Sequence, residues 1–203
     1  MRKRGARVQL ADVVRTLPRR AHDIPRRAVE ASQKWRLLEA MTEVVAKKGY
    51  LDASVADVIG AANVSRKTFY EQFRDKEDCF LSAYDVLSDR LVAALVTIGE
   101  DLPDGPARRA AQLEAFLAAL ARDLLVARVF MVDVLGAGPR ALLRRERVNR
   151  SFGEALLSEA LEPVRRAAIV GGINAVVAGA LLGRGVELAA LAGPLCAFIE
   201  SAL

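Results

Sequence analysis

The sequence predicts an all-α protein, and three observations support this prediction. Apolar residues recur three and four positions apart along most of the 203 residues, which is the spacing of one face of an α-helix. Alanine and leucine dominate these stretches, and Gly and Pro residues separate them. No stretch alternates apolar and polar residues in the manner of a half-buried strand. A chain of this length can bury a sizeable core in one domain or two small ones.

Composition argues against an enzyme or a metal protein. The chain has one histidine, His22, and two cysteines, Cys79 and Cys196, which form no C-x-x-C pair. These residues predict no His-based triad, no zinc site and no disulfide framework. The sequence also lacks a nucleophile elbow and a Gly-rich phosphate loop. We therefore expect a protein without catalytic residues, metal or cofactor, in the reducing cytoplasm.

Positive charge is concentrated at the N-terminus. Residues 1–30 carry nine Lys or Arg residues and three acidic residues, so their charge of +6 exceeds the +5 of the whole chain. They contain no apolar run long enough for a secretory signal. We expect residues 1–31 to form a basic, mostly disordered leader that either contacts a polyanion or only adds solubility.

The first helix is predicted over residues 33–48. Ser32 is placed to cap its N-terminus, and Gly49 is placed to end it. Apolar residues between Leu37 and Val45 lie on one face, and charged residues lie on the other.

Two short helices follow, over residues 55–62 and 66–73, and an Asn-Val dipeptide joins them. Ser54 and Ser65 are placed to cap these helices. Asn63 occupies the corner, where we expect a left-handed backbone conformation. Two short helices around a tight turn form a helix-turn-helix.

A long helix is predicted over residues 75–102, with Asp75 as its N-cap. It would span on the order of 40 Å, which is enough to connect two domains. Five further helices are expected over residues 107–122, 123–135, 139–161, 163–182 and 186–202. These limits predict a three-helix domain over residues 32–80 and a helical bundle over residues 81–203.

The second short helix is the part of a helix-turn-helix that enters the major groove of DNA. Phe69 and Phe73 are four residues apart, so both are expected to point inward and anchor this helix. Outward side chains can then reach base edges and phosphates. These side chains are those of Arg66, Lys67, Thr68 and Tyr70.

Several motifs share their order and spacing with one protein family. They are Gly49-Tyr50, Ser54-Val55, Val58-Ile59, Ala62-Asn63-Val64-Ser65, Thr68-Phe69-Tyr70, Phe73 and Lys76-Glu77. Over residues 33–83 the chain therefore resembles the DNA-binding domain of the TetR/AcrR family. The resemblance implies DNA contacts by Ser54, Ser65, Arg66, Lys67, Thr68, Tyr70 and Lys76, with Ser54 and Lys76 at phosphates.

The resemblance also implies the biological role. TetR-like proteins are typically homodimeric, cytoplasmic repressors that bind a pseudo-palindromic operator in double-stranded DNA. They leave the DNA when a small molecule binds the helical domain, and the effector of this chain is unknown. Asn63 and Lys67 stand where the family often has Gly, and Ile59 stands where it often has Ala. Base preference therefore does not transfer from the family.

Candidate residues for the effector pocket lie on the central helices of the second domain. Most are aromatic or aliphatic side chains, which more often form ordinary core. Asp133 differs, because a carboxylate in an apolar run needs an arginine partner or a polar cavity, and the arginines over residues 140–150 favour the partner. The candidates are Phe116, Leu120, Phe130, Met131, Asp133, Val134, Phe152, Leu156 and Asn174.

The last two helices are apolar, and the resemblance implies that they form a four-helix contact between two subunits. The interface candidates are Leu181, Leu182, Leu191, Leu195, Phe198 and Ile199. Residues 167–183 carry no charge but are barely long enough to span a membrane, so we interpret them as a helix of a soluble bundle.

The sequence thus predicts a ligand-responsive DNA-binding regulator that makes no membrane contact. Two alternatives stay open. One is a membrane-associated helical bundle, and the other is a DNA-binding regulator with no small-molecule effector.

Overall fold

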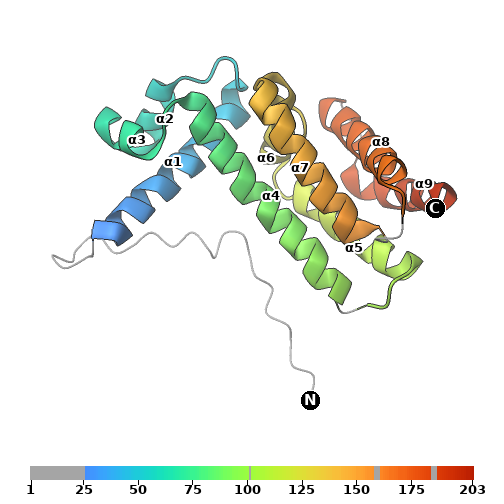
Figure 1. Cartoon of the computed structure of the whole chain (residues 1–203). Coiled ribbons are helices and arrows are strands. Elements are labelled where there is room, and N and C mark those ends of the chain that lie inside the picture. The colour runs from blue at the N-terminus through green and yellow to red at the C-terminus, as the bar shows by residue number, and fades with distance from the viewer. Residues whose placement is uncertain (1–25, 101, 158–160, 184–186) are drawn as a thin grey trace.

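The computed structural model describes residues 26–100, 102–157, 161–183 and 187–203, and in these ranges the chain contains helices and no strand. The predicted all-α class is therefore confirmed. Figure 1 shows two groups of helices that share one long helix, α4. Most of the predicted leader, up to residue 25, lies outside the described residues.

The first group contains α1 (Arg26–Lys48), α2 (Val55–Ala62) and α3 (Arg66–Gln72). The predicted N-cap at Ser32 is wrong, because α1 begins at Arg26 and Ser32 lies inside it. No Gly or Pro occurs within α1, so nothing in the sequence stops the helix at Ser32. Gly49 ends α1 as predicted, with a φ of +80° that favours glycine.

The corner between α2 and α3 has the predicted left-handed conformation at Asn63, with φ 51° and ψ 52°. The backbone N–H of Asn63 donates to the Gly60 carbonyl at 3.3 Å, and that of Val64 donates to the Ile59 carbonyl at 3.3 Å. These two bonds satisfy carbonyls at the end of α2 that have no partner inside the helix. The corner therefore fixes the direction in which α3 leaves α2.

Helix α4 (Lys76–Glu100) packs against α1 in the first group and against α5 and α7 in the second. The Asp75 carboxylate accepts the backbone N–H of Asp78 at 2.7 Å, so the predicted cap is confirmed. Phe80 and Tyr84 are buried on the inner side of α4, and Leu95 is buried near its other end. Buried residues of both groups form one continuous core through this helix.

The second group is α5 (Pro106–Ala121), α6 (Leu124–Met131), η2 (Asp133–Gly136), α7 (Pro139–Leu156), α8 (Pro163–Leu182), η3 (Leu188–Leu191) and α9 (Ala192–Ala202). The helix predicted over residues 123–135 breaks at Val132 into α6 and the 3₁₀ turn η2. Helix α7 ends earlier than predicted, because Leu157 has extended backbone.

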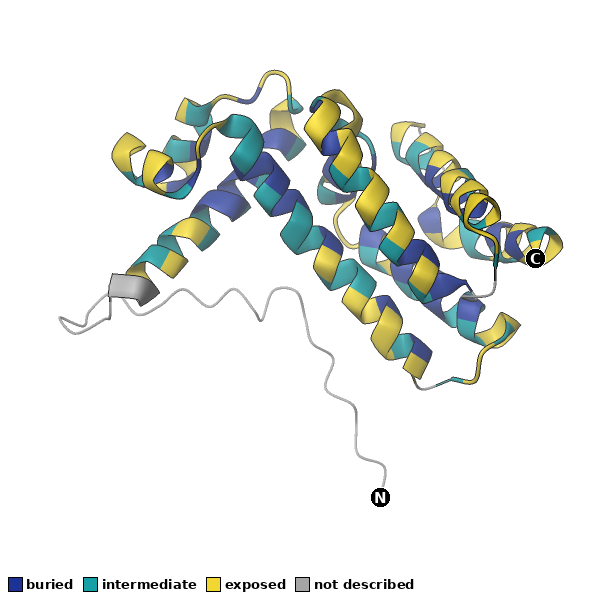
Figure 2. Cartoon of the chain, viewed as in Figure 1, coloured by how far each residue is buried: buried dark blue, intermediate teal, exposed yellow. Residues whose placement is uncertain are grey.

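The last predicted helix is likewise divided, into η3 and α9. Pro194 lies in the first turn of α9, where its missing N–H needs no partner, and this position sets where α9 can begin. Figure 2 shows that α8 and α9 expose much of their outer surface.

We predict that Asn63→Ala lowers the free energy of unfolding by about 1 kcal/mol, because alanine lacks the tolerance of asparagine for the left-handed region. Asn63→Gly should be within about 0.5 kcal/mol of the native chain, because glycine adopts this conformation without strain. Urea denaturation at one chain concentration measures both. Equal losses for the two variants would show that the backbone conformation is not the cause.

Candidate DNA-binding site and helical-domain cleft

A capping box fixes the N-terminus of α2. Ser54 Oγ accepts the backbone N–H of Asp57 at 3.2 Å, and Asp57 Oδ2 accepts the backbone N–H of Ser54 at 3.0 Å. Lys48 Nζ donates to Asp57 Oδ1 at 2.6 Å, and this bond, together with those from Ser54, lowers the pKa of Asp57 to about 2. The predicted cap is confirmed. Ser54 is exposed at this end of the helix, and its phosphate contact stays a prediction.

Helix α3 is capped by Ser65 and anchored by two phenylalanines. Ser65 Oγ accepts the backbone N–H of Thr68 at 3.0 Å, and the two hydroxyls lie 2.9 Å apart. Phe69 and Phe73 are buried, as predicted, with their ring centroids 5.8 Å apart. The anchored side of α3 determines which side chains face outward.

The outer side of α3 presents Arg66, Lys67 and Tyr70 to solvent, and Thr68 is half-buried. The Lys67 side chain is 87 % exposed, and its ammonium lies 3.8 Å from Glu71. The Tyr70 ring packs by its edge on Phe69, with centroids 5.3 Å apart, and is half-exposed. This arrangement suits a helix that inserts into a major groove.

The Lys76 ammonium is held by backbone carbonyls of the loop after α1, and its phosphate contact stays a prediction. Its ammonium donates to the carbonyls of Tyr50 and Ala53, both at 2.9 Å, and to that of Leu51 at 3.4 Å. It also lies 4.4 Å from the centroid of the Tyr50 ring. These bonds tie the loop after α1 to α4. A phosphate would have to compete with the three carbonyls for the Lys76 ammonium.

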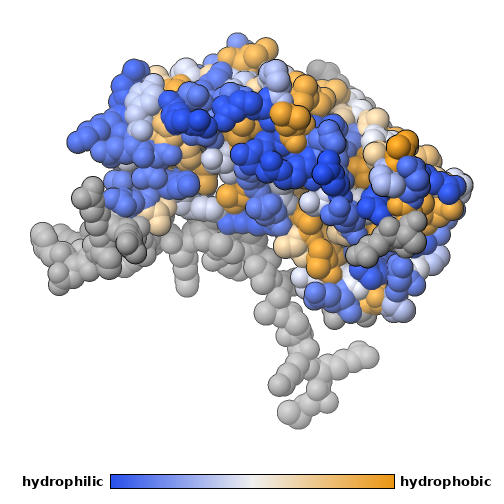
Figure 3. All heavy atoms as spheres, in the orientation of Figure 1, coloured by the Kyte–Doolittle hydropathy of each residue, from blue (hydrophilic) through white to orange (hydrophobic). Residues whose placement is uncertain are grey.

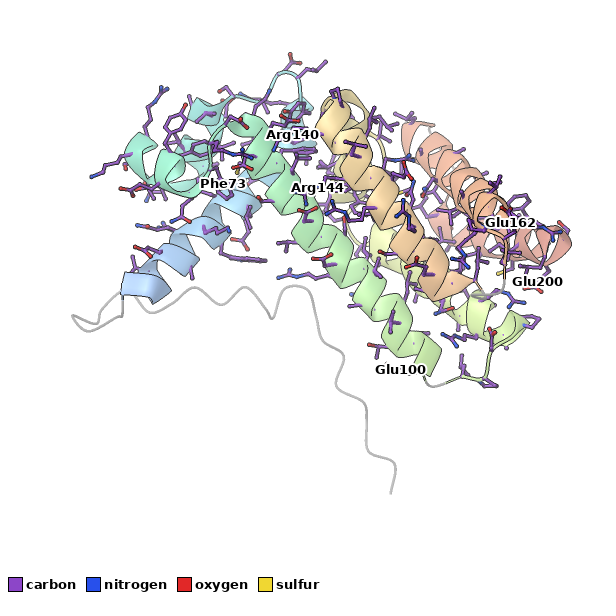
Figure 4. All side chains as sticks on the ribbon, viewed as in Figure 1. Phe73, Glu100, Arg140, Arg144, Glu162 and Glu200 are labelled. Carbon is purple, nitrogen blue, oxygen red and sulfur yellow. The ribbon has the colours of Figure 1, made fainter. Side chains whose placement is uncertain are left out.

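Two arginines of α7 form ion pairs with the first half of α4. Arg140 Nη1 donates to Glu77 Oε2 at 2.9 Å, and Arg144 pairs with Asp85. Figure 4 shows both arginines between the two helices, and Figure 3 shows strongly hydrophilic residues over this part of the surface. The sequence suggests these arginines as partners of Asp133, but in the structure they bind carboxylates of α4.

Asp133, the first residue of η2, lies close to the C-terminal end of α1. A Cβ atom added to Gly49, the residue after α1, would lie 3.9 Å from Asp133 Oδ1. Its Oδ2 is buried without a hydrogen bond, and Arg128 Nε is 3.9 Å away. Burial raises the pKa of Asp133, and Arg128 opposes this shift. An arginine is therefore nearby, but it is Arg128 and none of the arginines over residues 140–150.

The other predicted pocket residues form packed core in this structure. The Phe116 and Phe152 rings lie 4.9 Å apart, and Phe130 stacks on Tyr84 at 5.0 Å. Asn174 donates to Asn149 Oδ1 at 2.9 Å. The binding of an effector among these residues stays a prediction. The remaining buried members are Leu120, Met131, Val134 and Leu156.

A cleft of about 430 Å³ lies elsewhere, between α4 and α7. None of the nine predicted pocket residues lines it, because sequence spacing alone did not place α7 beside α4. Its walls carry charged, hydroxyl and small apolar side chains. The lining residues are Asp85, Ser88, Asp89, Val92, Ala93, Arg144, Arg147, Val148 and Ser151.

Two of the six predicted interface residues are wrong. Leu195 and Ile199 are 3 % and 0 % exposed, because they face the core of their own chain. Leu182 and Phe198 are exposed, and Leu181 and Leu191 are half-buried. The sequence could not separate these positions, because both sides of α8 and α9 are apolar.

The fold and the exposed side of α3 define the class: a two-part helical protein with a helix-turn-helix suited to DNA. Residues 37–83 match the family model of bacterial regulatory proteins of the tetR family. The resemblance drawn from the sequence is therefore confirmed, and the chain carries a TetR-family N-terminal domain. No curated protein matches the chain.

Similar solved structures cover nearly the whole described chain. The transcriptional regulator FadR from Bacillus subtilis, in complex with stearoyl-CoA, is 18 % identical with a TM-score of 0.74, over 83 % of this chain and 98 % of that chain. The fatty acid degradation regulator FadR from Bacillus halodurans is 22 % identical with a TM-score of 0.73, over 84 % and 96 %. A TetR transcriptional regulator from Rhodococcus sp. RHA1 is 18 % identical with a TM-score of 0.65, over 86 % and 97 %. These likenesses establish a common fold.

We predict that Asp133→Asn raises the melting temperature at neutral pH by a few degrees, because it removes a charge whose burial is unfavourable. A raised pKa in the folded state means that the aspartate costs stability above that pKa and that this cost disappears as the carboxyl is protonated. The gain in melting temperature should therefore shrink as the pH falls and the Asp133 carboxyl becomes protonated. A gain that does not change with pH would point to a cause other than the charge.

Proposed function

We propose that the chain is a homodimeric transcriptional repressor that binds a pseudo-palindromic DNA operator and leaves it when a small molecule binds the helical domain. The arrangement of α3 carries this proposal. Phe69 and Phe73 anchor the helix, and its outer side presents Arg66, Lys67 and Tyr70. Arginine and lysine can donate to guanine or phosphate, and tyrosine can reach phosphate.

The rest of the DNA interface is proposed around α3. Ser65 and Thr68 lie at its N-terminal end, which is the end that meets base edges. Ser54 lies at the exposed N-terminus of α2, where backbone N–H groups favour an anion such as a phosphate. Residues 1–25 would add affinity that does not depend on sequence, through their basic side chains.

The outer face of α8 supports dimerisation. Ala168, Gly171, Ala175 and Gly179 follow one another at helical spacing, and all four are exposed. Small residues in such a row let a second helix approach closely. Leu182 lies on the same face and is 65 % exposed. A two-fold contact here would set two α3 helices about 34 Å apart, at the spacing of two half-sites.

Helix α8 also bears on the membrane alternative. It is the one described helix long and apolar enough to cross a membrane, and 28 % of its apolar stretch is buried. Either a second copy of the chain or a lipid bilayer could cover this exposed face. The match to the TetR-family model favours the second copy of the chain. We therefore propose a cytoplasmic dimer.

An effector is supported by the fold and by the link between the two helix groups. The Bacillus subtilis protein of the same fold binds stearoyl-CoA, but at 18 % identity that ligand does not transfer. In this chain α4 packs against α1 of the first helix group and also forms one wall of the cleft. A ligand that moves α4 against α7 would change the separation of the two α3 helices.

We predict that Lys67→Ala and Tyr70→Ala each weaken binding to DNA from the region flanking the gene of this protein by about tenfold. Lys47→Ala is the matched control, because Lys47 is an exposed lysine outside α3, at the C-terminal end of α1, where it pairs with Glu43. Footprinting locates the site, and fluorescence anisotropy measures the affinity. If the native chain protects no discrete site, the proposed DNA-binding function is wrong.

We predict that Ala175→Arg converts the dimer to a monomer, because an arginine in the row of small residues prevents close contact between α8 helices. Ala94→Arg on the exposed side of α4 should leave the dimer intact. Sedimentation velocity distinguishes the two states. A native chain that is monomeric at micromolar concentration, or that fractionates with membranes, would contradict the proposed assembly.

A further inference from the structure

The cleft between α4 and α7 has opposite charges on its two walls. Asp85 and Asp89 lie on α4, and Arg144 and Arg147 lie on α7. Asp85 and Arg144 already form an ion pair at one end of the cleft. The charges of Asp89 and Arg147 are therefore the ones available to a ligand.

Asp89 and Arg147 have no hydrogen bond or ion pair with any residue that the structure describes. Both side chains are exposed, and they belong to opposite walls. Ser151 is half-buried in the same cleft, and its hydroxyl also has no partner among the described residues. The cleft thus presents one carboxylate and one guanidinium that form no ion pair with a described residue, and one hydroxyl that forms no hydrogen bond with one.

Apolar side chains lie between these polar groups. Val92 and Val148 are half-buried lining residues that come from the two walls, and Ala93 lies beside Val92. The volume of about 430 Å³ is near the lower end of the range for small-molecule pockets. The cleft therefore suits a small ligand with an aliphatic part.

The charge balance of the cleft selects among small ligands. A simple anion drawn to Arg147 would be repelled by Asp89, and a simple cation drawn to Asp89 would be repelled by Arg147. A molecule with both charges meets an opposite charge on each wall. We propose that this cleft binds an aliphatic, amino-acid-like zwitterion, with its ammonium at Asp89, its carboxylate at Arg147 and its side chain against Val92 and Val148.

Such a ligand would act on α4 directly. It would tie α4 to α7 close to the Asp85–Arg144 pair, on the helix that also carries the Glu77–Arg140 contact. Its role as an effector rests on the proposed function, whereas its binding to the cleft does not. The two can therefore be measured separately.

The experiment is isothermal titration of the full chain with L-leucine and with two analogues that each lack one charge. N-acetyl-L-leucine keeps the carboxylate, and L-leucinamide keeps the ammonium. L-leucine should bind about threefold to tenfold more tightly than either analogue, which is the range for an ion pair in a half-open site.

Variants assign each charge to its wall. Asp89→Asn should weaken L-leucine and L-leucinamide but not N-acetyl-L-leucine, whereas Arg147→Gln should weaken L-leucine and N-acetyl-L-leucine but not L-leucinamide. Glu100→Gln and Arg150→Gln are controls, since they remove like charges from α4 and α7 outside the cleft. They should leave all three affinities unchanged.

Three results would overturn the proposal. They are no binding of L-leucine up to about 10 mM, binding of N-acetyl-L-leucine or L-leucinamide as tight as that of L-leucine, and equal effects of the cleft and control variants. Operator affinity of the same proteins without ligand is recorded alongside. If the native chain binds no operator, the proposed function is wrong, but the measured binding of L-leucine to the cleft is unaffected.

Discussion

The structure depends on α4 being part of two packing arrangements at once. Its first half is held to the first helix group by Phe80 in the core and by Lys76, which binds carbonyls of the loop between α1 and α2. The same helix packs on α5 and α7. Because interiors are densely packed, α4 cannot move against one group without disturbing the other. This constraint couples the two helix groups mechanically.

Local signals were enough to predict the helix-turn-helix. Ser54, Asn63, Ser65 and Asp75 each act on backbone groups within four residues, so their roles follow from the neighbouring sequence. The inward direction of Phe69 and Phe73 follows from helical periodicity in the same way. Ser32 failed as a cap because a suitable residue type does not stop a helix that nothing else interrupts.

Contacts between distant segments could not be predicted in this way. The carbonyl partners of Lys76 lie in a loop more than twenty positions earlier in the chain, and Arg144 meets Asp85 only because α7 runs beside α4. Leu195 and Ile199 were assigned to a partner subunit because an apolar helix does not reveal which side its own chain covers. Helix packing determines which of these side chains meet and which are buried. The spacing of apolar residues in the sequence does not show how the helices pack.

The 25 residues of α4 contain no proline, and the helix is described as one unbroken element. At about 1.5 Å per residue it is on the order of 37 Å long, so a tilt of about 5° at one end displaces the other end by roughly 3 Å. That displacement is close to the rise of one base pair along DNA, about 3.4 Å. An uninterrupted helix of this length therefore converts a small tilt at one end into a displacement at the other end that is comparable to the rise of one base pair.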